Sequence, residues 1–332
     1  MLSDMALAVP MKFRCPTVIA MSVFALAATA CTDPRPFDGP AIHEAHWGPL
    51  TVEPGQEDTR CVVAKLDNTL EVKIHAMKNI ISTGSHHLIV YRDASATAEN
   101  LVPTHCSPFA GALAAGATGT SPIMITQKHS DELTLPPGVA YTFAPGQFVR
   151  LEMHFINTTD TPIIVEATTQ FMTADPNDVK YEADFMFIGT PDINLAPGTT
   201  STTRSYLPLR PEFEGVNIFA ITGHTHQFGT DMQVGYSAAR GMPVTSVYKP
   251  LVFAWGEPET VLQAPPFKVP TGGGFDFQCS YHNTSNETVK FGESANEEMC
   301  FFWAQGGLQN PHRARPSRTQ RLRRTPEAQR RA

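Results

Sequence analysis

The sequence predicts an all-β protein made of two β-sandwiches in tandem. Short runs rich in Val, Ile, Phe and Thr recur along the chain, and the 28 prolines and 23 glycines among its 332 residues fall largely between them. Such runs are typical of strands, and Pro and Gly are typical of the turns that join them. No long segment has the 3.6-residue apolar period of an amphipathic helix. The length favours two domains.

Each half of the chain contains four clear strand candidates. In the first half they lie at residues 70–77, 86–92, 148–156 and 162–172. A polar turn segment at 196–205 precedes the second set, at residues 216–229, 231–237, 275–284 and 297–303. We therefore expect one antiparallel sandwich over residues 49–178 and a second over residues 179–308.

The N-terminus has the pattern of an export signal. Lys12 and Arg14 precede an apolar run at 16–30 that ends in small residues before Cys31. The stretch "AATAC" is similar to a bacterial lipoprotein signal, in which Cys31 would carry the lipid, although Ala28 stands where a larger aliphatic residue is usual. We expect residues 1–31 to be this signal, with Met11 as the true start, and residues 32–48 to be a linker.

The signal predicts an exported protein, lipid-anchored in the cell envelope or free as a periplasmic or secreted protein. No later run approaches the roughly 18 apolar residues that a membrane helix needs, so a membrane would be contacted only through the lipid. Export permits disulfides. Four cysteines follow the signal, one pair in each half, and of the three possible connectivities we favour Cys61–Cys106 with Cys279–Cys300.

The charge is unevenly distributed. The whole chain has a net charge of −7, yet residues 311–332 hold eight Arg and one Glu, which leaves an acidic body. An acidic body argues against nucleic acid as a partner. Residues 309–332 have no apolar period, and we expect a disordered tail. A truncated or frame-shifted C-terminus, which would deprive the second sandwich of a strand, is the alternative.

His224 and His226 are the first candidate metal ligands. They lie one residue apart in the expected strand "ITGHTHQFG", so their side chains share a face. Two neutral imidazoles on one face form half of a metal site. The alternative is a sheet edge that tolerates histidine. Neither the Glu of a cupin-like oxygenase nor the Asp-His of an H-x-H-x-D-H zinc hydrolase follows this pair, and Gln227, Thr230 and Asp231 stand in that region.

Other candidate ligands lie elsewhere in the chain. His86 and His87 are adjacent and would face opposite ways unless a bulge turns them together, and His154 lies on the polar face of its strand. Met299, in "EEMC", would complete a His2Met set that favours Cu(I). Each has an alternative without a metal. His86 and His87 would then be a strand-end pair without function, His154 a surface residue, and Met299 a methionine that only fills the core.

Taken in order, these motifs resemble the type II copper, ascorbate-dependent monooxygenases. The resemblance runs from about residue 61 to residue 303. It rests on "HH", "LEMH", "HTH" and "EEMC", on Cys61 and Cys106 flanking the first pair, and on "LPPGV" and "CSYHNTS". The resemblance implies two jelly-roll sandwiches, each with one copper, which face each other across a wet cleft.

The resemblance also implies roles for the ligands. His86, His87 and His154 would bind an electron-storing copper, and His224, His226 and Met299 would bind the copper that meets O2 and carry the catalytic step. The reaction would be hydroxylation of an activated C–H bond of a small molecule, with ascorbate as reductant. A non-catalytic copper-binding or copper-delivery protein of the cell envelope is the alternative, and it would lack ascorbate-driven O2 consumption.

The substrate does not carry over from the peptide-hydroxylating members. Thr222 stands where they have the Arg that anchors a carboxylate, and Phe301 and Trp303 replace an Asn and a Tyr. We expect these three residues to line a pocket for an apolar or aromatic substrate; core aromatics are the alternative. Glu152 shares a face with His154 and could orient it, unless it is an ordinary solvated carboxylate.

Overall fold

The fold is almost entirely β-structure. The computed structural model describes residues 39–109, 120–292, 294 and 296–309. Its strands carry most of these residues, together with two single-turn 3₁₀ segments, η1 (Pro176–Asp178) and η2 (Pro211–Phe213). The predicted all-β class is confirmed. Within the described ranges, no helix has the length and apolar character needed to cross a membrane. The predicted export signal with Cys31, and the tail beyond residue 309, lie outside the described residues.

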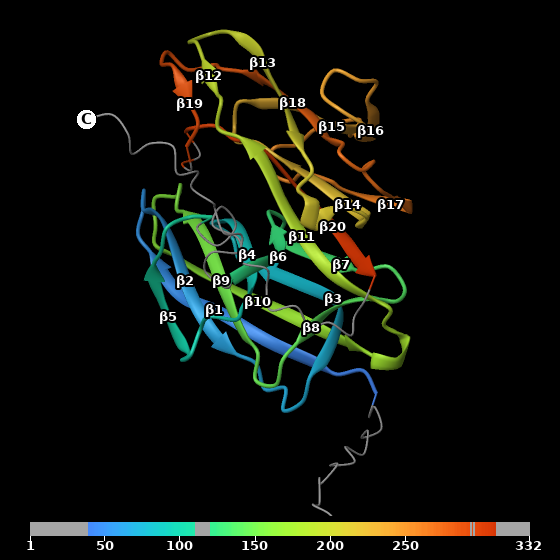
Figure 1. The fold of residues 1–332 in the computed structure, drawn as a ribbon. Helices are drawn as coiled ribbons and strands as arrows, with labels where there is room; N and C mark the ends of the chain where they lie inside the picture. The colour runs from blue at the N-terminus through green and yellow to red at the C-terminus, as the bar shows by residue number, and fades with distance from the viewer. Residues whose placement is uncertain (1–38, 110–119, 293, 295, 310–332) are drawn as a thin grey trace, which may run out of the picture. The chain divides into compact units, whose positions relative to one another are not determined.

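A nine-stranded sheet extends through both halves of the chain (Figure 1). Its order is β1 (Ile42–Val52), β10 (Ile163–Ala174), β3 (Val72–Ile81), β8 (Val139–Phe143), β11 (Tyr181–Thr190), β20 (Cys300–Gln309), β14 (Asn217–His224) and β17 (Thr260–Phe267), with β7 (Ser130–Thr134) also paired to β3. The β8–β11 pair, which joins the two halves, is parallel. Every other pairing in this sheet is antiparallel.

In the first half, a five-stranded sheet packs on the part of the long sheet that contains β1, β10 and β3. Its order is β5 (Asn100–His105), β2 (Glu57–Lys65), β9 (Phe148–Ile156), β4 (Ser85–Asp93) and β6 (Thr120–Thr126). The apolar face predicted for β9 lies in the core between these sheets: Val149, Leu151, Met153 and Phe155. The opposite face of β9, which carries His154, is therefore directed away from this core.

In the second half, a four-stranded sheet covers the other end of the long sheet. It consists of β13 (Thr200–Pro208), β18 (Gly274–His282), β15 (Gly229–Ser237) and β16 (Thr245–Tyr248), and a small sheet pairs β12 (Asn194–Leu195) with β19 (Val289–Lys290). Alternate residues of β18, Phe275, Phe277, Cys279 and Tyr281, fill its core. Two sandwich cores are thus present, while the jelly-roll connectivity and the boundary at 178/179 stay predictions.

The ordered β-structure begins earlier than the sequence indicates. Strand β1 starts at Ile42, inside the segment 32–48 that we expected to be a linker. Ala45 and Trp47 are buried while Glu44 and His46 are exposed, so the strand alternates as an edge strand should. The two histidines and the Glu in this stretch hide that alternation in the sequence.

Both predicted disulfides are present in the structure. Cys61–Cys106 ties β2 to the segment after β5, and Cys279–Cys300 ties β18 to the start of β20. Each bridge lies within one half. The second fixes the chain immediately after Met299, which restrains the position of that side chain.

A buried asparagine closes a loop at the end of one strand in each half. Asn157 follows β9, and its amide donates to the carbonyls of Val52 and Thr161 at 2.9 and 2.8 Å. Asn283 follows β18 and bonds the carbonyls of Leu195 and Glu287 at 3.0 and 2.8 Å. Each Oδ1 accepts two bonds from the residue two positions later. The two halves therefore repeat one local device.

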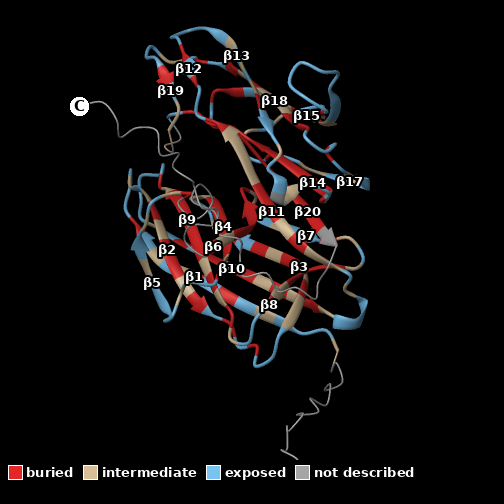
Figure 2. Cartoon of the chain, viewed as in Figure 1, coloured by how far each residue is buried: buried red, intermediate tan, exposed pale blue. Residues whose placement is uncertain are grey.

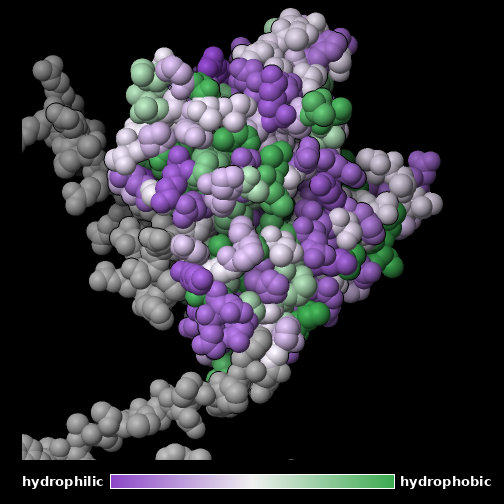
Figure 3. Space-filling model, turned by 90° about the vertical axis from the view of Figure 1, so that its right-hand side faces the viewer, coloured by the Kyte–Doolittle hydropathy of each residue, from purple (hydrophilic) through white to green (hydrophobic). Residues whose placement is uncertain are grey.

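The outer surface is mixed in character. On the face drawn in Figure 3, hydrophilic residues predominate and hydrophobic residues gather in its middle. Large apolar side chains that are well exposed include Leu251, Val252 and Leu262. The buried residues follow the strands of both sandwiches (Figure 2).

Replacing Asn157 tests the loop closure. Asn157→Ala would leave the carbonyls of Val52 and Thr161 and the two donors of Thr159 without this partner, so the free energy of unfolding should fall by about 2–4 kcal/mol. Urea denaturation measures the change. Thr158→Ala, at the exposed neighbouring position, should stay within about 0.5 kcal/mol of the parent. Equal stability of the two variants would contradict this role for Asn157.

Candidate metal centre

His86, His87 and His154 come together where β4 begins and β9 ends. His87 lies directly opposite His154 in the antiparallel pair, and the register shifts between Ser85 and His87. This irregularity is the bulge that the adjacent histidines require if both are to face one ion. The three ring centroids lie 5.1–5.3 Å from one another. The sequence therefore predicted this grouping correctly.

The spacing of these nitrogens fits a metal ion. Nδ1 of His86 and Nδ1 of His87 are 3.1 Å apart, and one ligand nitrogen from each of the three rings falls within 4.8 Å of the others. Two imidazoles bound to one tetrahedral ion at about 2.0–2.1 Å have nitrogens about 3.3 Å apart. His86 and His87 also have buried Nε2 atoms with no hydrogen-bond partner in the described chain.

Glu57 fixes the tautomer of His154. The Nε2 of His154 donates to a carboxylate oxygen of Glu57 at 2.9 Å. The proton is thereby held on Nε2, and the lone pair of Nδ1 is left for a metal ion. Glu57 lies at the start of β2, opposite Ile156 on β9. A carboxylate behind a histidine is the usual way in which a protein orients a metal ligand.

His224 and His226 form the second group. Strand β14 ends at His224, so His226 stands in the turn that follows and not in a continued strand, as the alternation had suggested. The two rings nevertheless lie 5.2 Å apart and nearly perpendicular. A Cβ at Gly229 would overlap the side chain of Thr225, so this turn packs tightly and needs a glycine there.

A buried carboxylate, that of Glu298, holds this turn against the start of β20. Its two oxygens accept the backbone N–H groups of His226 at 2.9 Å and Phe228 at 2.7 Å, and that of Met299 at 3.2 Å. Burial raises the pKa of Glu298 to about 7, against the opposing effect of these donors. One side chain thus ties His226 to Met299.

Each histidine of the second group has one nitrogen engaged and one available. Nδ1 of His226 donates to the carbonyl of Glu297 at 3.0 Å, and Nδ1 of His224 donates to Oε1 of Gln127 at 3.0 Å. Both lone pairs are therefore on Nε2. The Nε2 of His224 is buried and, among the described residues, has no partner. These orientations fit a metal ion bound through both Nε2 atoms.

Met299 is buried beside this group. Its side chain packs in the same apolar cluster as Phe109 and Trp303, whose rings lie 6.1 and 5.9 Å from that of His224. Its carbonyl accepts the hydroxyl of Tyr281 at 2.9 Å. A thioether in this position would complete a soft His2Met set suited to copper.

All five histidines are held in the neutral form that binds metals. Burial, and then the neighbouring imidazoles, lower the pKa of His86 to about 3 and that of His87 well below its usual value. Burial is also the main cause that lowers the pKa of His154, of His224, and of His226, the last to about 4. Neutral imidazole is the ligand form, so the apo site is prepared for a metal without loss of protons.

The two groups lie closer together than the resemblance implies. The rings of His86 and His226 are 6.3 Å apart, and Trp255 lies 6.2 Å from His86. His87, His154, His224 and His226 are each no more than 5% exposed. The expected wet cleft between the sites is therefore closed in this structure, because aromatic and imidazole rings from both halves fill it.

Glu152 is fully buried, so the alternative of a solvated surface carboxylate is wrong. It accepts the hydroxyl of Tyr91 at 2.8 Å and the backbone N–H of Phe109 at 2.6 Å. Phe109 has a φ of 51°, which is uncommon for a bulky residue, and its ring lies 5.0 Å from that of His87. Glu152 therefore acts on the site through Phe109, while Glu57 holds a ligand directly.

The three residues expected to line a pocket lie on one face. Thr222 pairs with Trp303 and His224 pairs with Phe301 across β14 and β20. Thr222 and Trp303 line a hollow of about 360 Å³ together with Met124 and Ile125 of the first half. Phe301 instead stacks on Phe187 at 5.0 Å, within the core. Trp303 thus stands between this hollow and His224.

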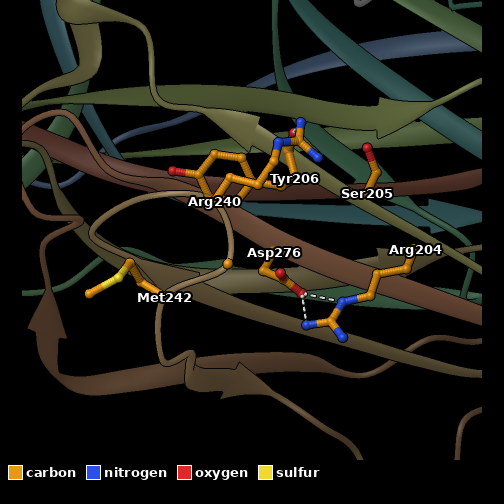
Figure 4. Close-up of a pocket in the computed structure, with 7 residues that line it drawn as sticks. Arg204, Ser205, Tyr206, Arg240, Met242 and Asp276 are labelled. Atoms are coloured by element: carbon orange, nitrogen blue, oxygen red, sulfur yellow. Dashed lines mark hydrogen bonds and ion pairs between the residues drawn. The ribbon is translucent and has the colours of Figure 1, made fainter.

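A second hollow, of about 450 Å³, lies on the four-stranded sheet and is separate from the histidines. Its two arginines are already engaged, as Figure 4 shows: Arg204 binds Asp276 at 2.9 Å. Arg240 lies over the ring of Tyr206 and donates to its carbonyl. No candidate ligand lines this hollow.

Sequence reasoning missed the residues that orient the ligands. Glu57 and Gln127 belong to no recognisable motif, and Glu298 lies in "EEMC" but was given no role; each lies far along the chain from at least one residue that it holds. The adjacency of Glu298 and Met299 was the one available signal. Glu57 and Gln127 become visible only when the strands are assembled.

The family comparison concerns the second half of the chain. Residues 181–305 match the family described as copper type II ascorbate-dependent monooxygenase, C-terminal domain, which supports the resemblance over this part of the sequence. This range includes His224, His226 and Met299. No curated protein matches the chain.

Three solved viral structures show a distant likeness. The major capsid protein P2 of bacteriophage PM2 is 10% identical, with 82% of this chain and 99% of that chain covered and a TM-score of 0.38. The broad bean stain virus structure is 7% identical, with 79% and 92% covered and a TM-score of 0.33. The Sulfolobus turreted icosahedral virus structure is 11% identical, with 78% and 60% covered and a TM-score of 0.22.

Acid should destabilise the metal-free protein. His86 and His226 have pKa values of about 3 and 4 when folded but protonate near pH 6.5 when unfolded. Their contribution to stability is therefore complete above pH 6.5 and is lost as the pH falls toward 4. Each should contribute up to about 1.4 kcal/mol per pH unit. Urea denaturation at pH 8, 6 and 5 measures the slope.

Two variants identify the source of this acid sensitivity. His86→Gln should make the decline in unfolding free energy shallower. His282→Gln, which replaces an exposed histidine, should leave the slope as it is in the parent. A parental slope in His86→Gln would show that this burial does not control the acid response.

Proposed function

We propose that this chain, part of which matches the copper type II ascorbate-dependent monooxygenases, hydroxylates an activated C–H bond of a small apolar or aromatic molecule with O2 and ascorbate. The observation that carries the proposal is the convergence of two sets of neutral, oriented imidazoles, one with a buried methionine. In the overall reaction, ascorbate gives two electrons and two protons. One oxygen atom enters the C–H bond, and the other leaves as water.

The first set is suited to electron storage. Copper bound at these sites would supply one-electron redox chemistry and the activation of O2. His86, His87 and His154 would hold one ion with three nitrogens, and Glu57 keeps His154 aimed at it. Three imidazoles can serve both copper oxidation states, and burial keeps other ligands away.

The second set is suited to the oxygen step. His224, His226 and Met299 would hold the other ion, and a thioether favours its reduced state. Glu298 fixes the backbone at His226, Phe228 and Met299, which restrains two of the three candidate ligands. Phe109 and Trp303 exclude water beside His224. Exclusion of water protects reactive intermediates from side reactions.

The hollow beside Trp303 is the candidate substrate site. Its inner wall contains Trp303, Met124 and Ile125, which suit an apolar or aromatic group. Thr222 offers no charge, and the lining cation Lys128 is accompanied by three carboxylates, those of Asp131, Glu132 and Glu259, which disfavour an anionic substrate. Trp303 touches both this hollow and the His224 ring, and a substrate held against it would lie next to the second metal site.

Export remains part of the proposal. Two disulfides in a chain of this size support an oxidising compartment. Together with the predicted signal, they support a protein of the cell envelope, lipid-anchored through Cys31, or a periplasmic or secreted protein. Intact mass of the natively expressed protein would show whether Cys31 carries a lipid.

Copper content tests the two-site arrangement. The protein from Thr32 onward should bind two copper ions, and His154→Ala and Met299→Leu should each weaken a different one. The parent should consume O2 with ascorbate when a substrate is present, and both variants should not. Two bound coppers without O2 consumption in a broad substrate screen would instead favour a copper-binding or copper-delivery protein.

Trp303 tests the substrate site. Trp303→Ala removes an aromatic wall worth about 1.5–3 kcal/mol of apolar contact, so the KM for an aromatic substrate should rise roughly 10–100-fold. Copper content should stay at the parental value. Met242→Ala, in the hollow on the four-stranded sheet, is the control and should leave KM unchanged. A parental KM in Trp303→Ala would remove this hollow from the proposal.

A further inference from the structure

Gln127 joins the two halves of the chain at a candidate metal ligand. It follows β6 in the first half, and its Oε1 accepts the Nδ1–H of His224, which ends β14 in the second half, at 3.0 Å. Both side chains are buried, with exposed fractions of 8% and 1%. The corresponding bond of His226 stays within the second half, because its Nδ1 donates to the carbonyl of Glu297.

The orientation of the Gln127 amide is fixed from its other side. Its Nε2 donates to the carbonyl of Trp255 at 3.4 Å, so Oε1 must face His224. An acceptor opposite Nδ1 holds the ring proton there, which leaves the lone pair on Nε2. That Nε2 is the buried nitrogen without a partner in the described part of the chain. Gln127 thus selects the tautomer that a metal at this site requires.

We propose that Gln127 is a positioning residue that sets the metal affinity of the second site from within the first half. The inference rests on the proposed metal role of His224, His226 and Met299. It adds that this site is incomplete unless the two halves are docked, because the acceptor behind His224 comes from the opposite half. Trp255 of the second half also lies 6.2 Å from His86, so the docking contacts continue to the first site.

Metal binding and docking are therefore linked. If the docked arrangement raises the affinity of the second site, then metal at that site stabilises the docked arrangement by the same factor. Loss of a partner behind a metal-bound histidine typically lowers affinity about 10–100-fold. Bound metal should therefore shift the equilibrium toward the arrangement in which Gln127 bonds His224 by the same factor, about 10–100-fold.

The experiment measures Cu(I) affinity in proteins that retain one site. His154→Ala leaves the second site, and His226→Ala leaves the first. Gln127→Leu should weaken the second site roughly 10–100-fold and leave the first unchanged, although Gln127 belongs to the first half. Gln127→Glu retains an acceptor and should preserve most of the affinity. Glu57→Gln, which alters the partner of His154, should give the opposite pattern.

A purely structural role would give a different result. Damage to the first half by Gln127→Leu would weaken the first site, whose ligands all belong to that half, and an equal loss at both sites would overturn the proposal. Unchanged affinity at the second site would also overturn it. Gln170→Leu, another glutamine of the first half, which bonds Glu44 and no histidine, is the matched control and should alter neither site.

The imidazole nitrogens provide a test without metal. ¹⁵N NMR of the metal-free protein should show His224 protonated on Nδ1, and Gln127→Leu should shift this ring toward the Nε2-protonated tautomer. An unchanged tautomer would overturn the proposal. If the parent bound no copper at the second site, the proposed function would fail, and the spectra would still decide whether Gln127 positions His224.

Discussion

The burial of five uncharged imidazoles is the constraint on which the rest of this structure depends. A buried histidine that gains a proton loses the solvation of its charge, so the folded chain holds these rings neutral. A neutral ring has one donor and one acceptor, and each must be satisfied or left for a metal. Glu57, Gln127 and the carbonyl of Glu297 each bond one nitrogen of His154, His224 and His226, and the Nδ1 atoms of His86 and His87 bond each other. Neighbouring rings lie 5.1–6.3 Å apart, and this cluster of imidazoles is the candidate site.

The same constraint explains why irregular backbone is found where the ligands lie. His86 and His87 share one site because β4 bulges at that point, and His226 reaches its position in a turn after β14 has ended. Neither feature is held by sheet pairing alone. Glu298 replaces the missing pairing with three bonds to backbone N–H groups, which is why a carboxylate is buried beside Met299.

The sequence was sufficient for what is local or periodic. Alternation located β9, chemistry and order brought together His86, His87 and His154, and the position of one cysteine pair in each half indicated the disulfides. It was insufficient wherever contacts are made between distant strands. Glu57 lies 97 residues from His154, and Gln127 lies 97 residues from His224. The edge strand β1 was missed because its two histidines and its Glu resemble a polar linker. No local pattern encodes such pairs.

The matched asparagines suggest how one fold came to hold two sites of different chemistry. Asn157 and Asn283 close equivalent loops after β9 and β18, so the loop geometry is common to both halves. The ligands are not placed equivalently: His154 lies three residues before Asn157 on β9, whereas His224 and Met299 lie on and beside other strands. The two asparagine loops are common to both sandwiches, whereas the candidate ligands differ because different strand ends carry histidine. Since strand ends are free of the ladder's alternation, they can accept ligands without disturbing either core.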